Sequence, residues 1–164
     1  MKILLPRPLT REAFAPFGDV IETEGAHHFP INQGTTERYH DLANLNMREG
    51  GRAIVSIFRG QPRSYPMQIT ALERHPLGSQ AFIPMQRRPY LVVVAESQLV
   101  SREPGTVHAF IARGDQGVNY AAGTWHHPLL AMDEVSDFVV IDRKGEGFNC
   151  DEVELAEPLL LQLS

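Results

Sequence analysis

Tyr90-Leu-Val-Val-Val-Ala-Glu96 is a run of apolar and β-branched residues that contains no turn residue. Side chains alternate between the two faces of a strand, so both faces of residues 91–95 are apolar. A strand that is apolar on both faces is covered on both sides. The stretch therefore predicts a central strand in a β protein.

Eight other short runs are also rich in β-branched and aromatic residues, and turn residues separate nearly all of them. These runs are 19–22, 52–59, 67–73, 80–84, 107–112, 118–120, 128–132 and 137–142. The 13 glycines and 12 prolines also favour turns over long helices. Only residues 10–16 predict a brief helical turn, with Thr10 as its N-cap. We therefore expect an all-β fold, a sandwich or barrel with a few short helices.

The bulk composition limits the class of protein. At 164 residues, the chain predicts one domain over residues 1–164, without repeats or linkers. The net charge of −5 and the scattered basic residues argue against a nucleic-acid surface. The apolar residues 3–5 end at Pro6, no other run approaches the length of a membrane span, and the single cysteine, Cys150, fits a reducing compartment. We expect a cytoplasmic protein without a membrane anchor.

The last part of the chain changes character. Residues 151–158 are acidic, and Leu159-Leu-Leu161 follows them. Because an exposed leucine run favours aggregation or association, we expect this segment to lie across the barrel or across a partner subunit.

Glu73-Arg-His-Pro-Leu-Gly-Ser-Gln80 places three polar side chains around one turn. Glu73 and His75 are two residues apart, so on a strand they point to the same side and can share one target. Gln80 follows the turn and can return to the same cavity with an amide that both donates and accepts hydrogen bonds. The alternative is a surface hairpin in which Glu73 and His75 are only solvated.

Ala121-Ala-Gly-Thr-Trp-His-His-Pro128 contains adjacent histidines. In an extended chain they point to opposite faces, and the position after Gly123 favours His126 as the one that faces a cavity. The alternative is a core histidine that is satisfied by a backbone carbonyl. The spacings Glu-x-His-x4-Gln and Ala-x-Gly-x2-His are similar to the two motifs with which cupin barrels collect ligands around a metal or a small substrate.

Thr36-Glu-Arg-Tyr-His-Asp41 gathers a cation, two anions, a phenol and an imidazole. A guanidinium holds a planar carboxylate with two parallel hydrogen bonds, which makes Arg38 a candidate substrate anchor, with Tyr39 and His40 beside it. The alternative is an exposed turn with an ion pair between Glu37 and Arg38. Three other arginines are candidates on weaker grounds: Arg59, Arg63 and Arg143.

A metal site would draw on His75, His126 and Gln80. With Glu73 they offer two imidazoles, one amide and one carboxylate, a weaker set than the three histidines and one glutamate of a typical metallo-cupin. Imidazole and oxygen ligands suit nickel, zinc or manganese. The pattern therefore predicts a loosely held divalent ion that assists the chemistry, or none.

Seven motifs stand in an order that is similar to bacterial members of the ureidoglycolate lyase family. They are Val20-Ile-Glu22, Glu37-Arg-Tyr-His-Asp-Leu42, Leu72-Glu-Arg-His-Pro-Leu-Gly78, Gln80-Ala-Phe-Ile-Pro-Met85, Gly117-Val-Asn-Tyr120, Trp125-His-His-Pro-Leu129, and Asp137-Phe with Ile141-Asp-Arg143. The likeness covers residues 14–152, and the loops at 46–51 and 143–149 depart from the family pattern.

The resemblance implies a cupin-like jelly-roll β-barrel, usually a homodimer, associated with nickel. It implies a cytoplasmic lyase that splits (S)-ureidoglycolate into glyoxylate and urea during the degradation of allantoin, a purine product, for nitrogen. Whether the two subunits of such a dimer share their active sites stays open.

Ureidoglycolate carries a hydroxyl, a carboxylate and the ureido nitrogen on one carbon. Its collapse requires a base for the hydroxyl proton and an acid for the departing nitrogen, and imidazoles perform both tasks near neutral pH. We expect His75, oriented by Glu73, and His126 to form this pair, in an order that the sequence leaves open. The remaining groups would bind the substrate: Arg38, Tyr39, His40, Gln80 and Asn119.

Two other functions are compatible with the sequence. Another metallo-cupin enzyme, such as an isomerase or a dioxygenase, would require tightly held metal and a fuller ligand set than one with Gln80. A non-catalytic sensor of small hydroxy or oxo acids is the other alternative, because a fold alone does not determine chemistry.

Overall fold

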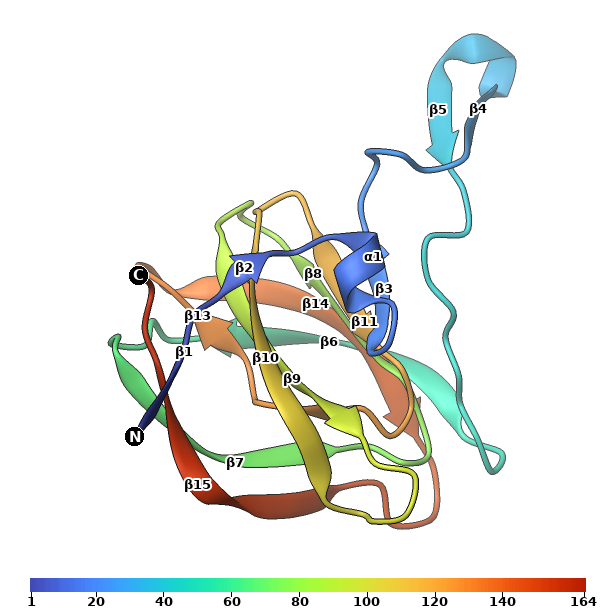
Figure 1. The fold of residues 1–164 in the computed structure, drawn as a ribbon. Helices are drawn as coiled ribbons and strands as arrows, with labels where there is room; N and C mark the ends of the chain where they lie inside the picture. Colours follow the sequence, from blue (N-terminus) through green and yellow to red (C-terminus); the bar gives the residue numbers. More distant parts are fainter.

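A computed structural model describes residues 1–164 as two curled β-sheets and a separate two-stranded hairpin (Figure 1). The first sheet has the order β1-β15-β7-β12-β9-β10-β2, with β13 also beside β9. Its strands are β1 (Lys2–Leu4), β2 (Arg7–Pro8), β7 (Met67–Arg74), β9 (Tyr90–Ser97), β10 (Pro104–Ala112), β12 (Trp125–His126), β13 (Leu130–Ala131) and β15 (Asp151–Leu161).

The second sheet has the order β3-β11-β8-β14-β6 and packs against one face of the first. Its strands are β3 (Gly18–Ile21), β6 (Arg52–Gly60), β8 (Gln80–Pro84), β11 (Gly117–Tyr120) and β14 (Ser136–Lys144). The expected all-β, cupin-like fold is confirmed.

Strand β9 lies between two hydrophobic cores. Tyr90, Val92 and Val94 point into the core between the two sheets, where they meet residues of β8, β10, β11 and β14. The alternate residues of β9 point into a second core, which the first sheet encloses by curling on itself: Leu91, Val93 and Ala95. Burying one large apolar side chain contributes about 1.5–3 kcal/mol, so a strand that is buried on both faces is among the most strongly held in the fold. The predicted central strand is confirmed.

The short helix α1 (Arg11–Phe14) closes one side of the core between the sheets. It begins as expected, because the Thr10 side chain accepts a hydrogen bond from the backbone N–H of Ala13 at 3.1 Å. Its buried Phe14 packs edge-on against Phe110 of β10, with ring centroids 5.8 Å apart. No helix of this structure has the length and apolar content that crossing a membrane would require.

The acidic tail was expected to lie across the barrel or a partner, and it forms β15 of the first sheet. This strand pairs with β7 along most of its length and with β1 near its end, where Leu161 is fully buried. Val153 and Leu155 face the second core, while the acids of the segment, Asp151, Glu152, Glu154 and Glu157, stay exposed or half-exposed. This strand was not predicted from the sequence, although residues 152–155 alternate polar and apolar side chains, because glutamate and proline are rare in strands.

The hairpin arm consists of β4 (His28–Ile31), the short 3-10 turn Asn32–Gly34 and β5 (Thr36–Tyr39). Figure 1 shows that it projects away from the two sheets on the side of β3. Its hydrogen bonds and its ion pair, between His28 and Glu37, lie within the arm and its base. The side chains of the arm therefore have no hydrogen-bond or ion-pair partner in the rest of the chain.

Truncating Phe110 to alanine should lower the free energy of unfolding by about 3–5 kcal/mol, because the side chain is fully buried and leaves a cavity between Phe14 and Phe17. Urea unfolding with an unchanged m-value would measure this loss. The matched control is Leu99→Ala, a fully exposed position, which should change stability by less than about 0.5 kcal/mol. Equal effects of the two substitutions would contradict the assignment of the core.

Candidate active site

Three neighbouring strands place polar side chains in a row. Glu73 of β7 lies opposite His126 of β12 on one side and opposite Glu152 of β15 on the other. Residues that face each other across an antiparallel pair share a face of the sheet. Glu73 is therefore the middle member of a row that crosses the three strands.

A tight turn before β12 positions His126. Gly123 adopts a φ of +82°, which a glycine reaches without strain, and its N–H donates to the backbone carbonyl of His75 at 2.9 Å. The Thr124 hydroxyl donates to the carbonyl of Phe17 at 2.9 Å. The turn thus ties β12 both to the end of β7 and to the segment after α1. His126, with only 2% of its surface exposed, faces the row, as its position after Gly123 predicts.

Backbone carbonyls determine which nitrogen of each imidazole carries the proton. Nδ1 of His75 lies 2.9 Å from the carbonyl of Asn149, and Nδ1 of His126 lies 3.0 Å from that of Thr124. A carbonyl oxygen only accepts hydrogen bonds, so both Nδ1 atoms are protonated donors. The two Nε2 atoms are left with free lone pairs when the rings are neutral.

Both Nε2 atoms point at one carboxylate oxygen. Oε1 of Glu73 is 3.5 Å from Nε2 of His126 and 3.9 Å from Nε2 of His75. The interaction with His126, followed by the charges of both imidazoles, holds the pKa of Glu73 below its usual value against the opposing effect of burial. The His126 ring also stacks on Tyr120, with centroids 4.3 Å apart and planes 10° from parallel. The imidazole is therefore fixed on both its edge and its face.

This arrangement fits a divalent cation. One donor atom from each of Glu73, His75 and His126 lies within 4.8 Å of the others. Nε2 of His75 is buried and has no hydrogen-bond partner, which leaves a lone pair for a cation to take. Histidine ligands of metals usually donate their other N–H to a carbonyl or carboxylate, as these two do. The sequence offers both Gln80 and Glu73 beside the two histidines; the structure gathers Glu73 with them, and Gln80 as a further ligand stays a prediction.

A cavity of about 340 Å³ opens beside this row. Its lining comes from β6, β7, β8, β12 and the loops next to them: Phe58, Arg59, Gly60, Arg63, Glu73, Gln80, Phe82, His126, Pro128 and Leu129. We call it the barrel cavity. Glu73 and His126 line it directly, whereas His75 is not part of the lining and lies beside His126, with ring centroids 5.2 Å apart.

Only one of the two polar atoms of the Gln80 side-chain amide forms a hydrogen bond. Its Nε2 donates to Asp142 at 3.1 Å, while its buried Oε1 has no hydrogen-bond partner. A buried polar atom without a partner is costly, and a donor in the cavity would satisfy it. The structure therefore places Gln80 in the same cavity as Glu73 and His126.

Four of the expected substrate-binding residues lie elsewhere in the chain. Arg38 and Tyr39 lie on β5 of the hairpin arm, which projects away from the two sheets (Figure 1), and His40 directly follows them; none of the three lines the barrel cavity. Asn119 pairs with Ala81 on β8, whose neighbours Gln80 and Phe82 face inward, so Asn119 faces the outside of the second sheet. There its amide donates to Asp19 and to the carbonyl of Asn44, which fastens the segment before β6. The structure does not bring these four residues together with the histidines.

Sequence reasoning did not foresee the neighbours of Glu73 on β15. Cys150 and Glu152 each place a donor atom within 4.8 Å of Glu73 and of each other. Burial and the charge of Glu73 raise the pKa of the Cys150 thiol. Only the pairing of β15 with β7 brings the two segments together, so no local sequence signal could have found them.

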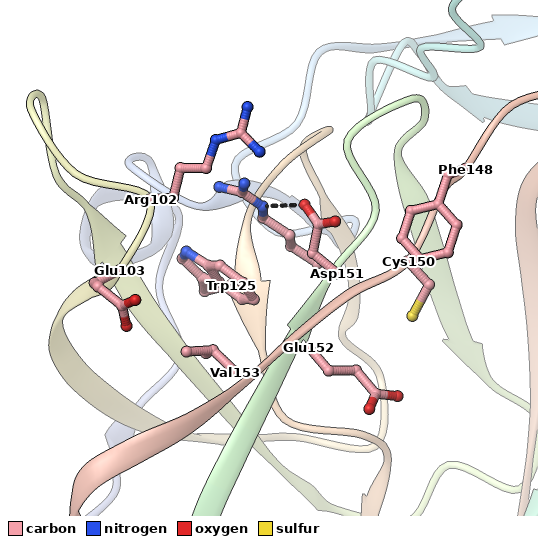
Figure 2. A pocket seen from close by; sticks show the side chains of 9 residues that line it. Arg102, Glu103, Trp125, Phe148, Cys150, Asp151, Glu152 and Val153 are labelled. Atoms are coloured by element: carbon pink, nitrogen blue, oxygen red, sulfur yellow. Dashed lines mark hydrogen bonds and ion pairs between the residues drawn. The ribbon is translucent and has the colours of Figure 1, made fainter.

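A wider hollow of about 700 Å³ adjoins the same strands (Figure 2). Trp125 lines it, and the Arg74 guanidinium stacks over the indole at 4.5 Å while it binds Asp151 at 2.9 Å. Arg74 follows Glu73 and Trp125 precedes His126, so this stacked pair lies on the face opposite the row, while Cys150 and Glu152 also line the hollow. The stacked pair braces the strands that carry the row.

Comparison with known proteins identifies relatives over nearly the whole chain. The profile of a family described as "Ureidoglycolate lyase" matches residues 1–162. A protein named ureidoglycolate lyase from Burkholderia mallei (strain NCTC 10229) is 59% identical over 162 residues, which cover 98% of this chain and 94% of the relative. Proteins of the same name are 60% identical over 155 residues in Burkholderia cepacia, covering 93% and 86% of the two chains, and 52% identical over 164 residues in Pseudomonas syringae pv. syringae (strain B728a), covering 99% and 96%.

Nitrogen-15 NMR of the imidazoles, recorded on chelator-treated protein at a pH where they are neutral, should show His75 and His126 as Nδ1–H tautomers. The reason is that each Nδ1 faces a carbonyl that can only accept. His108 is the internal control, because its Nε2 lies 3.3 Å from Glu96 and should carry the proton. An Nε2–H tautomer at His126 would contradict the arrangement of donors around Glu73.

Proposed function

The chain belongs to the ureidoglycolate lyase family, and we propose that it splits (S)-ureidoglycolate into glyoxylate and urea. The observation that carries the proposal is the Glu73 carboxylate, which faces the Nε2 atoms of both His75 and His126 beside a cavity of substrate size. One domain over residues 1–164 carries this activity.

The two imidazoles serve as the base and the acid of the elimination. The base takes the proton of the substrate hydroxyl as the carbonyl of glyoxylate forms, and the acid protonates the ureido nitrogen as the carbon–nitrogen bond breaks. The single carboxylate of Glu73 balances one positive charge, so the cluster is electrically neutral when one imidazole is protonated and the other is not. This is the state that the reaction requires. His126 meets the substrate directly, and the neighbouring His75 completes the pair.

Gln80 recognises the urea group. Its free Oε1 can accept a hydrogen bond from an N–H of the substrate, because its own amide nitrogen is held by Asp142. The contact binds the leaving group in the orientation in which its nitrogen faces the acid. It also satisfies an oxygen that is otherwise buried without a partner.

A divalent cation would be held by Glu73, His75 and His126, and we propose nickel, which imidazole and oxygen donors suit. When bound, the cation would take the Nε2 lone pairs of the imidazoles and would supply Lewis acidity that makes the substrate hydroxyl more acidic, in place of proton transfer by those imidazoles. Three ligands from one carboxylate and two imidazoles make this a weaker site than that of a cupin with four protein ligands. We place the reaction in the cytoplasm, in the release of nitrogen from allantoin, as the family resemblance implies.

We further propose a homodimer that buries the outer face of the second sheet. Val55 and Ile57 of the edge strand β6 are 70% and 59% exposed, and they lie beside Ile141 and Val139 of β14 on the same face. The other edge of β6 has no strand partner along its nine residues. A long, apolar edge strand is a template for association, and the hairpin arm projects from the same sheet. A second copy of the chain would cover both.

Purified, chelator-treated protein should produce urea and glyoxylate in equal amounts from racemic ureidoglycolate, above the spontaneous rate, and added nickel should increase the rate. His126→Ala and His75→Ala should each lower kcat by about 10²- to 10⁴-fold, the contribution of one proton transfer. His28→Ala, on the hairpin arm, is the control and should keep kcat. Formation of ammonia instead of urea, or near-normal turnover by both variants, would overturn the proposal.

Ile57→Asp should convert the dimer to a monomer, because it would bury a carboxylate in the apolar face. Light scattering coupled to size-exclusion chromatography should give twice the chain mass for the native protein and the chain mass for the variant. Leu99→Asp, which is fully exposed elsewhere, should remain dimeric. A native protein that elutes as a monomer would refute this interface.

A further inference from the structure

The proposed substrate carries a carboxylate on its reacting carbon, and the barrel cavity must supply a cation for it. Of the residues that line this cavity, only Arg59 and Arg63 carry a guanidinium. Glu73 is the one carboxylate of the lining, and it is committed to the imidazoles. The choice of anchor therefore lies between two arginines.

Arg59 is already paired. Its Nε and Nη2 donate to the two oxygens of Asp137 at 2.8 and 3.2 Å, a bidentate arrangement. This pairing raises the pKa of Arg59 and lowers that of Asp137. The Asp137 carboxylate also accepts from Gln86. A substrate carboxylate would have to displace this partner, so Arg59 does not offer a free cation.

The backbone of Arg63 is held in place by hydrogen bonds, whereas its guanidinium has no partner. Its N–H donates to the carbonyl of Ala131 at 3.1 Å, and Pro62 forms an isolated bridge with the same residue. The Tyr65 hydroxyl donates to that carbonyl at 3.0 Å. The loop is thus pinned to β13, while the guanidinium of Arg63 has no hydrogen bond or ion pair within the chain.

Arg63 lines the same cavity as His126 and Gln80. Its guanidinium charge therefore attracts an anion that binds among these side chains.

The other arginines near the site have different tasks. Arg74 stacks on Trp125 on the opposite face of the strands. Arg143 is buried and donates to the carbonyls of Arg48, Glu49 and Glu146, so it holds loops together. Arg38 lies on the hairpin arm.

We propose that Arg63 binds the carboxylate of the substrate and makes the enzyme specific for an acid over a neutral carbinol-urea. The inference rests on the proposed function and deepens it by naming the group that selects the substrate. The guanidinium pairs with both carboxylate oxygens, so the substrate carbon is held with its hydroxyl and ureido nitrogen toward His126 and Gln80.

The test compares two substrates that differ only in the carboxylate: ureidoglycolate and N-(hydroxymethyl)urea, which breaks down to formaldehyde and urea. Arg63→Ala should lower kcat/KM for ureidoglycolate by about 10- to 100-fold, the typical effect of a lost charged hydrogen bond. It should leave kcat/KM for N-(hydroxymethyl)urea within about twofold, since that substrate has no group for Arg63 to bind. Arg63→Lys should give an intermediate loss, because an ammonium keeps the charge without the bidentate geometry.

The control is Arg102→Ala at the rim of the other hollow, which should change neither substrate. An equal loss for both substrates in Arg63→Ala, or no loss for either, would overturn the role of Arg63 while the native enzyme still splits ureidoglycolate. Failure of the native protein to accelerate the breakdown of ureidoglycolate would instead overturn the proposed function. The activity of the native enzyme on ureidoglycolate therefore distinguishes the two failures.

Discussion

The proposed active site depends on the contacts between the Glu73 carboxylate and two imidazoles. Glu73 lies opposite His126 across one strand pair and opposite Glu152 across another, and two imidazole Nε2 atoms converge on it. Each imidazole is held from behind by a backbone carbonyl, so neither can turn its protonated nitrogen toward Glu73. The carboxylate, in turn, cannot be replaced by an amide without presenting donors and acceptors in another order. One side chain thus links the register of three strands to the protonation of two histidines.

That register is maintained by the cores rather than by the site itself. Trp125 packs into the core enclosed by the first sheet, while the next residue, His126, stacks on Tyr120 in the core between the sheets. A slip of one residue in β12 would exchange the two faces and place an indole where the imidazole belongs. The burial of β9 on both faces holds the neighbouring β12 in place. Packing energy therefore positions the proposed catalytic groups.

The sequence predicted what depends on local pattern. The alternation in residues 91–95, the Thr10 cap and the choice of His126 over His127 follow from period and turn chemistry, and the structure shows each of them. The sequence also predicted the approximate limits of most strands in the second sheet. Residues that are close only through long-range pairing could not be predicted from the sequence: Cys150 and Glu152 lie beside Glu73 because β15 returns to β7. Arg38 stood in the most polar local cluster, yet that cluster lies on an arm that leaves the barrel.

The two faces of β7 and β12 are chemically distinct but mechanically joined. The Arg74–Trp125 stack and the Arg74–Asp151 ion pair lie on the far face, because Arg74 and Trp125 are the strand neighbours of Glu73 and His126. Since consecutive residues of a strand share one backbone, a shift that relieves one face displaces the other by a similar amount. Proton transfer tolerates displacements of only a fraction of an ångström before its rate falls. The far face is therefore constrained by the chemistry of the near face, although none of its side chains meets the substrate.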